Sequence, residues 1–407
     1  MSFTVVICAD HGFVNGGQAK VAIESALGLK AAGLRVVFFA AVGPLDERLA
    51  EAGVETLCLS QHDILTNPSR KAAALQGMWN KPAETALVKL LARMPEKNTL
   101  VHVHGWAKAL SPSIAAAIRA SGFPAVYTMH EYFLHCPNGG FYDYRADRIC
   151  PLQPLSTACW AQNCDSRSYG IKLWRNARLL VAKKLAKLEN VFSDMILISD
   201  LQQEKLAPHM ARGARTHRVC NPIAIDPLGH KADPGAGDLL FVGRLSPEKG
   251  AHLFAEAARR IGVNPVFVGD GPLLEPLAAR YPQGWFMGWR SPAETRMLMR
   301  AARAVVFPSL WYEGQPLTVL EAKALGTPVV VSDACAGREE IEHGVSGLWF
   351  NSGNPAALAQ MLAAVSDERL TAQLSSGAYD SYWANPPTLQ RHVAETVRVY
   401  ERALGRG

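Results

Sequence analysis

The 407-residue sequence has no apolar run near the roughly 18 residues that a membrane span requires. Its first segment, Met1–Ala9, has no basic residue ahead of the apolar stretch, so we expect a buried strand and not a signal peptide. Cysteine is scarce, with 8 residues, which does not indicate a disulfide scaffold in a chain of this length. These absences predict a cytoplasmic protein with reduced cysteines.

Composition and length indicate a globular protein of more than one domain. Hydrophobic residues make up 49% of the chain and charged residues 19%, which excludes a disordered chain. A chain of this length exceeds one compact core, so we expect two domains. No Gly-x-Gly-x-x-Gly segment follows the first predicted strand of either half, which disfavours an NAD-dependent enzyme.

The net charge of +6 is unevenly distributed. Residues 1–215 carry 24 Lys and Arg against 17 Asp and Glu, whereas residues 216–407 carry 18 against 19. This asymmetry indicates either an anionic partner for the first half or ordinary surface variation. We expect no nucleic-acid partner.

Apolar strand-like runs alternate with amphipathic segments along both halves of the chain, which predicts two α/β domains with parallel sheets. A Pro-, Gly- and Asp-rich stretch at residues 221–238 is the predicted linker. We expect a first domain over residues 1–220, a second over residues 221–385, and a final helix over residues 386–407 that returns toward the first domain. The predicted strands are Thr4–Ala9, Arg35–Ala40, Leu100–His104, Ala125–Thr128, Leu239–Val242, Pro265–Val268, Val305–Phe307 and Pro328–Val331. The predicted helices are Gln18–Ala32, Ala83–Arg93, Pro112–Ser121, Glu248–Ile261, Leu317–Leu325 and Thr388–Leu404.

Two glycine-containing turns follow predicted first strands. Gly16 and Gly17 lie between such a strand and a helix, where the free N–H groups of the helix can bind an anion; a simple tight turn is the alternative. Gly243 lies at the equivalent turn of the second half, flanked by Arg244 and Lys249. Two fixed cations there suit a diphosphate, and a solvated helix end capped by Ser246 is the alternative.

The most specific segment runs from Glu313 to Glu321. Glu321 lies among apolar residues of a predicted helix, where a carboxylate is costly to bury without a partner such as a ligand hydroxyl. The start of this helix can hold phosphate. Its predicted donor-binding residues are Gly314, Gln315, Pro316 and Leu317.

Taken together, these motifs resemble those of the retaining glycosyltransferases of the group 1 class (family 4). The Glu-x7-Glu pattern of that family is matched by Glu313 and Glu321, and its Gly-Arg-Leu-x-x-x-Lys-Gly pattern by residues 243–250. Further matches are Gly16-Gly17, Gly269–Pro272, the run His102–Trp106, and His130-Glu131, where the family more often has Asp after the His. The resemblance covers essentially the whole chain and implies a GT-B fold, with two facing Rossmann-like domains and a cleft between them.

The resemblance also implies the role of each matched residue. Arg244 and Lys249 would neutralise the diphosphate of a nucleotide-sugar donor, with backbone contacts from Gly16 and Gly17. Glu313 would bind hydroxyls of the donor sugar, and Glu321 the ribose. His130 would lie near the reacting sugar, although a buried structural histidine is the alternative. His102 and His104 share one face of a strand, where packing is favoured over metal binding.

For the reaction, the resemblance implies retention of anomeric configuration without a catalytic metal, and the lack of an Asp-x-Asp segment agrees. The acceptor would be a saccharide or a lipid-linked glycan in surface-polysaccharide assembly. The alternatives are a GT-B sugar-nucleotide epimerase and a non-catalytic nucleotide-sugar-binding protein.

Two further features lie between the matched motifs. Cys136, Cys150, Cys159 and Cys164 cluster in a loop over residues 134–165 that has few core-forming residues. Structural zinc, free thiols and disulfides are three alternative states for these four cysteines. Residues 171–188 follow, with six Lys or Arg and no acid at helical spacing, which suits either an anionic inner membrane surface or a solvated helix on its own domain.

Overall fold

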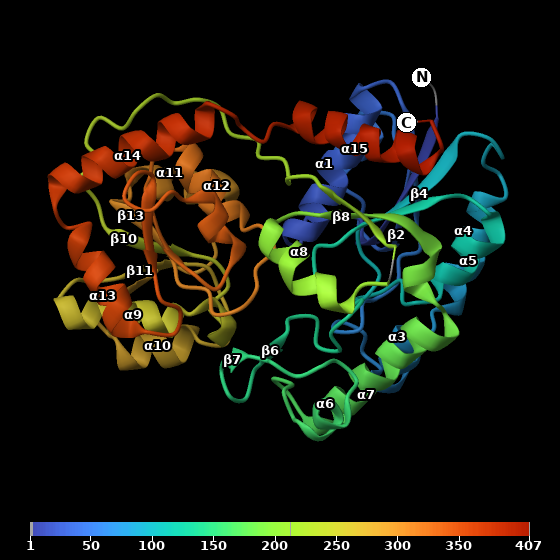
Figure 1. Ribbon diagram of the computed structural model, residues 1–407, viewed down its shortest axis with the longest axis horizontal. Coiled ribbons are helices and arrows are strands. Elements are labelled where there is room, and N and C mark those ends of the chain that lie inside the picture. The colour runs from blue at the N-terminus through green and yellow to red at the C-terminus, as the bar shows by residue number, and fades with distance from the viewer. Residues whose placement is uncertain (1–2, 212, 407) are drawn as a thin grey trace.

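A computed structural model describes residues 3–211 and 213–406, and these residues form two α/β domains that lie side by side (Figure 1). Residues of both domains line a cleft between them. The first domain has a seven-stranded parallel sheet in the order β3-β2-β1-β4-β5-β8-β9, and the second a six-stranded parallel sheet in the order β12-β11-β10-β13-β14-β15. In each sheet the strand order reverses beside the first strand, between β1 and β4 in one sheet and between β10 and β13 in the other. Ligands bind at this switch point in open α/β sheets. The predicted α/β class is confirmed.

The first sheet is buried on both faces because its strands are apolar at consecutive positions. Val6 and Cys8 of β1 pack with α4 and α5, and the alternate residues Val5 and Ile7 pack toward α1 and α15. The strands of this domain are β1 (Thr4–His11), β2 (Arg35–Val42), β3 (Glu55–Cys58), β4 (Thr99–Val103), β5 (Ala125–Thr128), β8 (Phe192–Leu197) and β9 (Arg215–Arg218). Its helices are α1 (Gly17–Ala31), α2 (Glu47–Glu51), α3 (Arg70–Met78), α4 (Lys81–Leu91), α5 (Ile114–Ser121), α6 (Thr157–Ala161), α7 (Tyr169–Leu180) and α8 (Asp200–Leu206).

The second domain repeats this layered arrangement. Its strands are β10 (Leu239–Val242), β11 (Val266–Val268), β12 (Trp285–Phe286), β13 (Ala304–Phe307), β14 (Val329–Ser332) and β15 (Gly347–Phe350). Its helices are α9 (Ala251–Ile261), α10 (Leu274–Arg280), α11 (Pro292–Ala301), α12 (Leu317–Ala324), α13 (Pro355–Ala364) and α14 (Glu368–Trp383).

The chain crosses between the domains twice, and the two crossings lie side by side. The Ile223 amide donates to the Pro387 carbonyl at 2.9 Å. After the second crossing, α15 (Leu389–Ala403) lies along α1 of the first domain (Figure 1). Its residues Val393, Val399 and Tyr400 are buried in the core of that domain.

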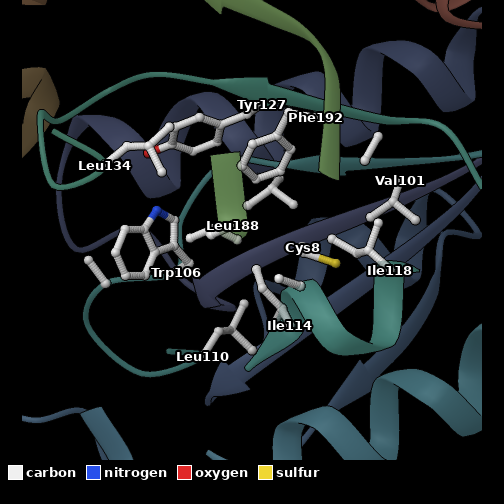
Figure 2. Packing of buried hydrophobic residues seen from close by; sticks show 14 of the residues in the cluster. Cys8, Val101, Trp106, Leu110, Ile114, Ile118, Tyr127, Leu134, Leu188 and Phe192 are labelled. Atoms are coloured by element: carbon white, nitrogen blue, oxygen red, sulfur yellow. The ribbon is translucent and has the colours of Figure 1, made fainter. Parts of the chain in front are cut away.

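Loops that carry the site are anchored in the first core. Trp106, which follows β4, is 1% exposed and lies in one buried cluster with Leu134, which follows β5 (Figure 2). Leu188 and Ile114 belong to the same cluster. Because both loops are fixed by apolar packing, the polar residues beside them have a defined position.

Two helices begin later than the sequence predicts. The helix expected at Pro112 begins at Ile114, because the Ser111 hydroxyl accepts from the Asn80 amide and holds Ser111 in a left-handed conformation. The helix expected at Glu248 begins at Ala251. A 3-10 turn over Pro247–Lys249 comes first, and Gly250 then adopts φ 72°, where a Cβ would collide with the Pro308 carbonyl. Ser246 makes no capping hydrogen bond, so its predicted capping role is wrong.

The first domain also contains an excursion between β5 and β8 that the second domain lacks. It comprises a two-stranded hairpin of β6 (Tyr142–Asp143) and β7 (Arg148–Ile149), followed by α6, α7 and a π turn over Val181–Leu185. In Figure 1 this segment lies below the cleft and extends toward the second domain.

Candidate functional site

The predicted site residues follow the carboxyl ends of β1 and β5 in the first sheet and of β10 and β13 in the second. In each case a buried parallel strand ends and a polar loop follows. This is the expected place for a ligand in such sheets.

The glycine loop of the first domain leaves space for a ligand. Gly16 has no atom within 4 Å of the position that a Cβ would occupy, and Gly17 begins α1 next to the Leu317 side chain of the other domain. The first turn of α1 carries no acidic residue. Its amide groups can therefore bind an anion from the first-domain side.

A second wall is formed by the turn after β10. Gly243 has φ 153°, and the close approach of Gly269 to its carbonyl leaves no room for a Cβ on Gly269. Arg244 is exposed toward the cleft and Lys249 is half-buried. The Lys249 ammonium lies 2.5 Å from Glu313 Oε1 and 5.5 Å from the ring centroid of Trp311. Lys249 and Glu313 are thus brought together.

Glu313 is held by more than this ion pair. The Ser309 hydroxyl donates to Glu313 Oε1 at 2.9 Å, and the Ala336 amide donates to the Glu313 carbonyl at 3.1 Å. The carboxylate therefore has a fixed position, and its Oε2 remains for other donors.

Helix α12 presents its N-terminus to the same space. Pro316 occupies the N-cap position and no side chain caps the helix, so the first amides have no side-chain acceptor. Glu321, one turn further on, has a 17% exposed side chain and accepts from Lys20 Nζ of the first domain at 3.1 Å. Gln315 instead accepts from the Asn221 amide at 2.7 Å, so its side chain is bound to the linker.

His130 belongs to a stack of imidazoles. Its Nε2 lies 3.1 Å from His104 Nδ1, and the His104 ring lies 4.1 Å from the His102 ring. His102 in turn contacts the hydroxyls of Thr128 and of Tyr400, at 2.7 Å and 2.5 Å. Burial lowers the pKa of His130 to about 3, with further contributions from His392 and Lys108. At neutral pH His130 is therefore an uncharged imidazole that can donate or accept a hydrogen bond.

Sequence reasoning missed a contact that joins the domains. The Glu339 carboxylate accepts from the Asp200 and Leu201 amides at the start of α8, at 3.0 Å and 2.5 Å, and lies 3.3 Å from Arg218. It also missed Lys20, the partner of Glu321. The signal in the sequence is weak, because these pairs join residues more than 100 positions apart.

The cysteines of the 134–165 loop are free and close to one lysine. Lys172 is 1% exposed and donates to Cys159 Sγ at 3.3 Å, and Asn138 donates to Cys164 Sγ at 3.4 Å. Burial raises the pKa of Cys164 to about 11. Over residues 3–211 and 213–406, no group of three or more His, Cys, Asp or Glu side chains is arranged to hold a metal ion. This geometry gives the predicted zinc no support, and disulfides are not formed.

The basic segment forms a helix whose two sides differ. Lys172 and Arg178 are buried, at 1% and 3% exposure. The outer side exposes Leu180 and Leu185, with Lys184 nearby. The prediction of a simple solvated helix is therefore incomplete, since part of its charge points into the protein.

Comparisons with known proteins agree with this geometry. Residues 16–180 match the glycosyl transferase 4-like domain model, and residues 236–368 match the model of glycosyl transferases group 1. This chain belongs to the group 1 glycosyltransferases. Its GT-B fold is supported by the sucrose-phosphate synthase of Thermosynechococcus elongatus, with a TM-score of 0.74, 19% identity and coverage of 100% of both chains.

Two other similar proteins are relevant to the enzyme's chemistry. A UDP-Gal:alpha-D-GlcNAc-diphosphoundecaprenol alpha-1,3-galactosyltransferase of Escherichia coli is 26% identical over 70% of this chain and 70% of its own length. A GDP-mannose-dependent alpha-mannosyltransferase of Corynebacterium glutamicum is 30% identical over 48% of this chain and 49% of its own. The enzyme is therefore a glycosyltransferase. None of the helices in the described residues is long and apolar enough to span a membrane.

Proposed function

We propose that this glycosyltransferase moves a sugar from a nucleoside-diphosphate sugar to a saccharide or lipid-linked acceptor, with retention of anomeric configuration and without a catalytic metal. The observation that carries the proposal is the meeting of Lys249, Glu313 and the uncapped start of α12 opposite the Gly16-Gly17 loop. Cations and amides from two domains surround one space between them.

The charges suit the reaction. Glycosyl transfer places negative charge on the departing diphosphate, which fixed cations and amides stabilise in a water-poor site. In the absence of donor, Lys249 and Lys20 are paired with Glu313 and Glu321. When the donor binds, Lys249 and Arg244 turn to its diphosphate, while Glu313 and Glu321 accept from sugar and ribose hydroxyls. The uncharged His130 serves as a hydrogen-bond partner of the transferred sugar.

The roles proposed for the two glutamates support the proposed retention. A glycosidase of the double-displacement type needs two carboxyl groups flanking the reacting bond. In the proposed complex Glu313 accepts from hydroxyls of the donor sugar and Glu321 from the ribose, so neither carboxylate serves as the nucleophile. The departing phosphate can then accept the proton of the acceptor hydroxyl, which favours attack from the face that the phosphate leaves.

A donor screen tests the proposal. Thermal shifts with UDP-, GDP- and ADP-sugars identify the donor, and incubation with the best donor should give a glycoside and a free nucleoside diphosphate. An epimerised donor would support the epimerase alternative, and binding without turnover the non-catalytic one. The coupling constant of the anomeric proton in the product reports its configuration, and activity should persist in EDTA.

Two narrower proposals concern the surroundings of the site. The exposed leucines and lysines of 171–188 suit contact with an anionic membrane surface, where a lipid-linked acceptor of a surface polysaccharide would lie. Structural zinc in the cysteine loop stays a prediction. Metal analysis of protein purified without chelator tests it, and a metal-free protein would exclude it.

A further inference from the structure

A cavity of about 630 Å³ lies between the domains, next to the donor site. One wall comes from the first-domain excursion and α7, and the other from the turn after β10 together with Trp311. Its volume is in the range of pockets that hold a small ligand. The cationic side chains that line it are Lys108, Arg145, Arg167, Arg175, Arg178 and Arg244.

The carboxylates that line the same cavity do not balance these cations. They are Glu131 and Glu248. Glu131 lies 3.1 Å from Lys108, and the Ser246 hydroxyl donates to Glu248 Oε1 at 2.7 Å. Five arginines therefore line the cavity, and none of them is paired with a carboxylate that also lines it.

One buried residue holds three of these arginines in place. Asp165 has a 0% exposed side chain and lies 3.2 Å from Arg175 Nε. Its Oδ1 accepts from the Arg167 amide at 2.9 Å, and its carbonyl accepts from Arg145 Nε at 3.0 Å. Arg145 then donates to the Arg167 carbonyl at 2.8 Å. Arg145 and Arg167 are exposed, but hydrogen bonds fix the side chain of Arg145 and the backbone of Arg167, and the ion pair with Asp165 holds Arg175.

Arg178 lies deepest in the cluster. Its guanidinium lies 5.0–5.8 Å from the ring centroids of Trp106, Phe133 and Trp174, and donates to the Ala107 carbonyl at 2.7 Å. Burial lowers the pKa of Arg178 and of Arg167, and the nearby Arg175 lowers both further. Such mutual repulsion is relieved when an anion enters.

The guanidinium of Arg167 remains available for a ligand. Within residues 3–211 and 213–406 it makes no hydrogen bond, although Asp165 and Arg145 fix its backbone. Planar guanidinium groups match phosphate oxygens in pairs. A neutral saccharide, by contrast, needs hydrogen-bond acceptors as well as donors.

We propose that this cavity is an acceptor subsite for a sugar that carries a phosphate or diphosphate group. The inference rests on the proposed transferase function, because it assigns the second substrate of that reaction. Arg145, Arg167, Arg175 and Arg178 bind the phosphate from the first-domain side, and Phe133 and Trp311 pack against the sugar. Arg244, on the opposite wall, belongs to the donor diphosphate.

The experiment compares two probes that differ only in the presence of a diphosphate group. They are N-acetylglucosamine linked through C1 to undecyl diphosphate, and undecyl N-acetylglucosaminide. Binding of each is measured by calorimetry with the wild type, with Arg167→Gln, and with Arg148→Gln. Arg148 is a matched control because it is an exposed arginine of the same excursion, as Arg167 is, but does not line the cavity. Thermal shift with the best nucleotide is recorded for each protein.

The wild type should bind the diphosphate probe about tenfold or more tightly than the neutral probe, with an advantage that falls as salt rises. Arg167→Gln should remove most of that advantage and leave the nucleotide shift unchanged, whereas Arg148→Gln should change neither. Equal binding of the two probes by the wild type would overturn the proposal. So would inorganic pyrophosphate binding as tightly as the sugar-bearing probe, or loss of the nucleotide shift in Arg167→Gln, which would place Arg167 in the donor site. A wild type that binds the diphosphate probe but no nucleotide would refute the proposed donor function and leave this subsite standing.

Discussion

The two domains share the arrangement of their strands but differ in how they place charge at the cleft. In the second domain two of the charged groups at the cleft are paired: Lys249 lies 2.5 Å from Glu313, and Glu321 is paired with Lys20 of the first domain. In the first domain, the excursion between β5 and β8 carries arginines in excess of their carboxylates. In the roles proposed above, the second domain binds the donor and the first-domain excursion binds the acceptor.

The domains also differ in what they bury. The first domain buries the imidazoles of His102, His104 and His135, and α15 adds His392. The histidines of the second domain, His230, His252 and His343, are not buried. Acid and mutation should therefore affect the two halves in different ways.

Acidification should destabilise the first domain selectively, and this is the largest effect we expect. Burial lowers the pKa of His135 to about 3, and that of His102 and His104 well below its usual value. Because unfolded histidine has a pKa of about 6.5, the unfolded chain binds more protons below that pH, and stability is lost as the pH falls from 6.5 toward 3. For His135 this cost is about 2 kcal/mol at pH 5. Calorimetry between pH 7.5 and 5 should show the first-domain transition moving furthest.

His135→Leu tests the cause of this shift. Both ring nitrogens of His135 are buried without a hydrogen-bond partner among the described residues, so leucine removes a titrating group and no hydrogen bond. The variant should be more stable than the wild type at pH 5, and this difference in stability should be smaller at pH 7.5. Parallel loss of stability in the two proteins would show that His135 is not responsible.

Removing a donor-site cation should give the next largest effect. Lys249→Ala should lower kcat by about 100- to 1000-fold, because one fixed group that stabilises the departing charge is lost. Initial rates of nucleoside diphosphate release measure this. Arg260→Ala, an exposed cation at the end of α9 paired with Glu256, is the control and should retain activity. A rate for Lys249→Ala within a few-fold of the wild type would contradict the assigned role.

Sequence patterns predicted the second domain more fully than the first. Strands such as Leu239–Val242 and the start of α12 follow from local signals, because buried apolar runs and helix starts are short-range features. The delayed start of α9 does not follow from them. It depends on the contact between Gly250 and the Pro308 carbonyl, which is 58 positions away.

The first-domain site was harder to predict for the same reason. The sequence shows six cations in 171–188 but not that Arg178 turns inward between three aromatic rings. It shows Asp165 as one acid near many bases, and only the folded excursion makes it the support of three arginines. Loop geometry fixed by distant partners has no periodic pattern.

The ribose contact should give a smaller effect than the diphosphate contact. Glu321→Ala removes a carboxylate that accepts from ribose hydroxyls, and hydrogen bonds to charged groups contribute about 1.5–3 kcal/mol. Calorimetry should show weaker binding of the preferred nucleoside diphosphate and almost no difference between that nucleotide and its 2′,3′-dideoxy form. Glu275→Ala, an exposed glutamate of α10, should keep the wild-type preference. If Glu321→Ala still prefers the ribose form as strongly as the wild type, the assignment is wrong.

The smallest effect that we expect is on membrane binding by the outer face of the excursion. This face would let the first domain contact a membrane, whereas the second domain would not. Leu185 is 67% exposed beside Lys184. Leu185→Glu should reduce binding to vesicles of anionic phospholipid by about tenfold, because an apolar contact is lost and a repelled charge is gained. Leu228→Glu, at a leucine of the linker that is 58% exposed, should bind like the wild type. Co-sedimentation at low salt measures both. Because the arginines of the cavity lie on the inner side of the same segment, a loss in Leu185→Glu with unchanged binding of the soluble diphosphate probe would separate the membrane contact from acceptor recognition. Equal sedimentation of all three proteins would contradict the membrane contact. The acceptor subsite would then be the remaining explanation for the positive charge of the excursion.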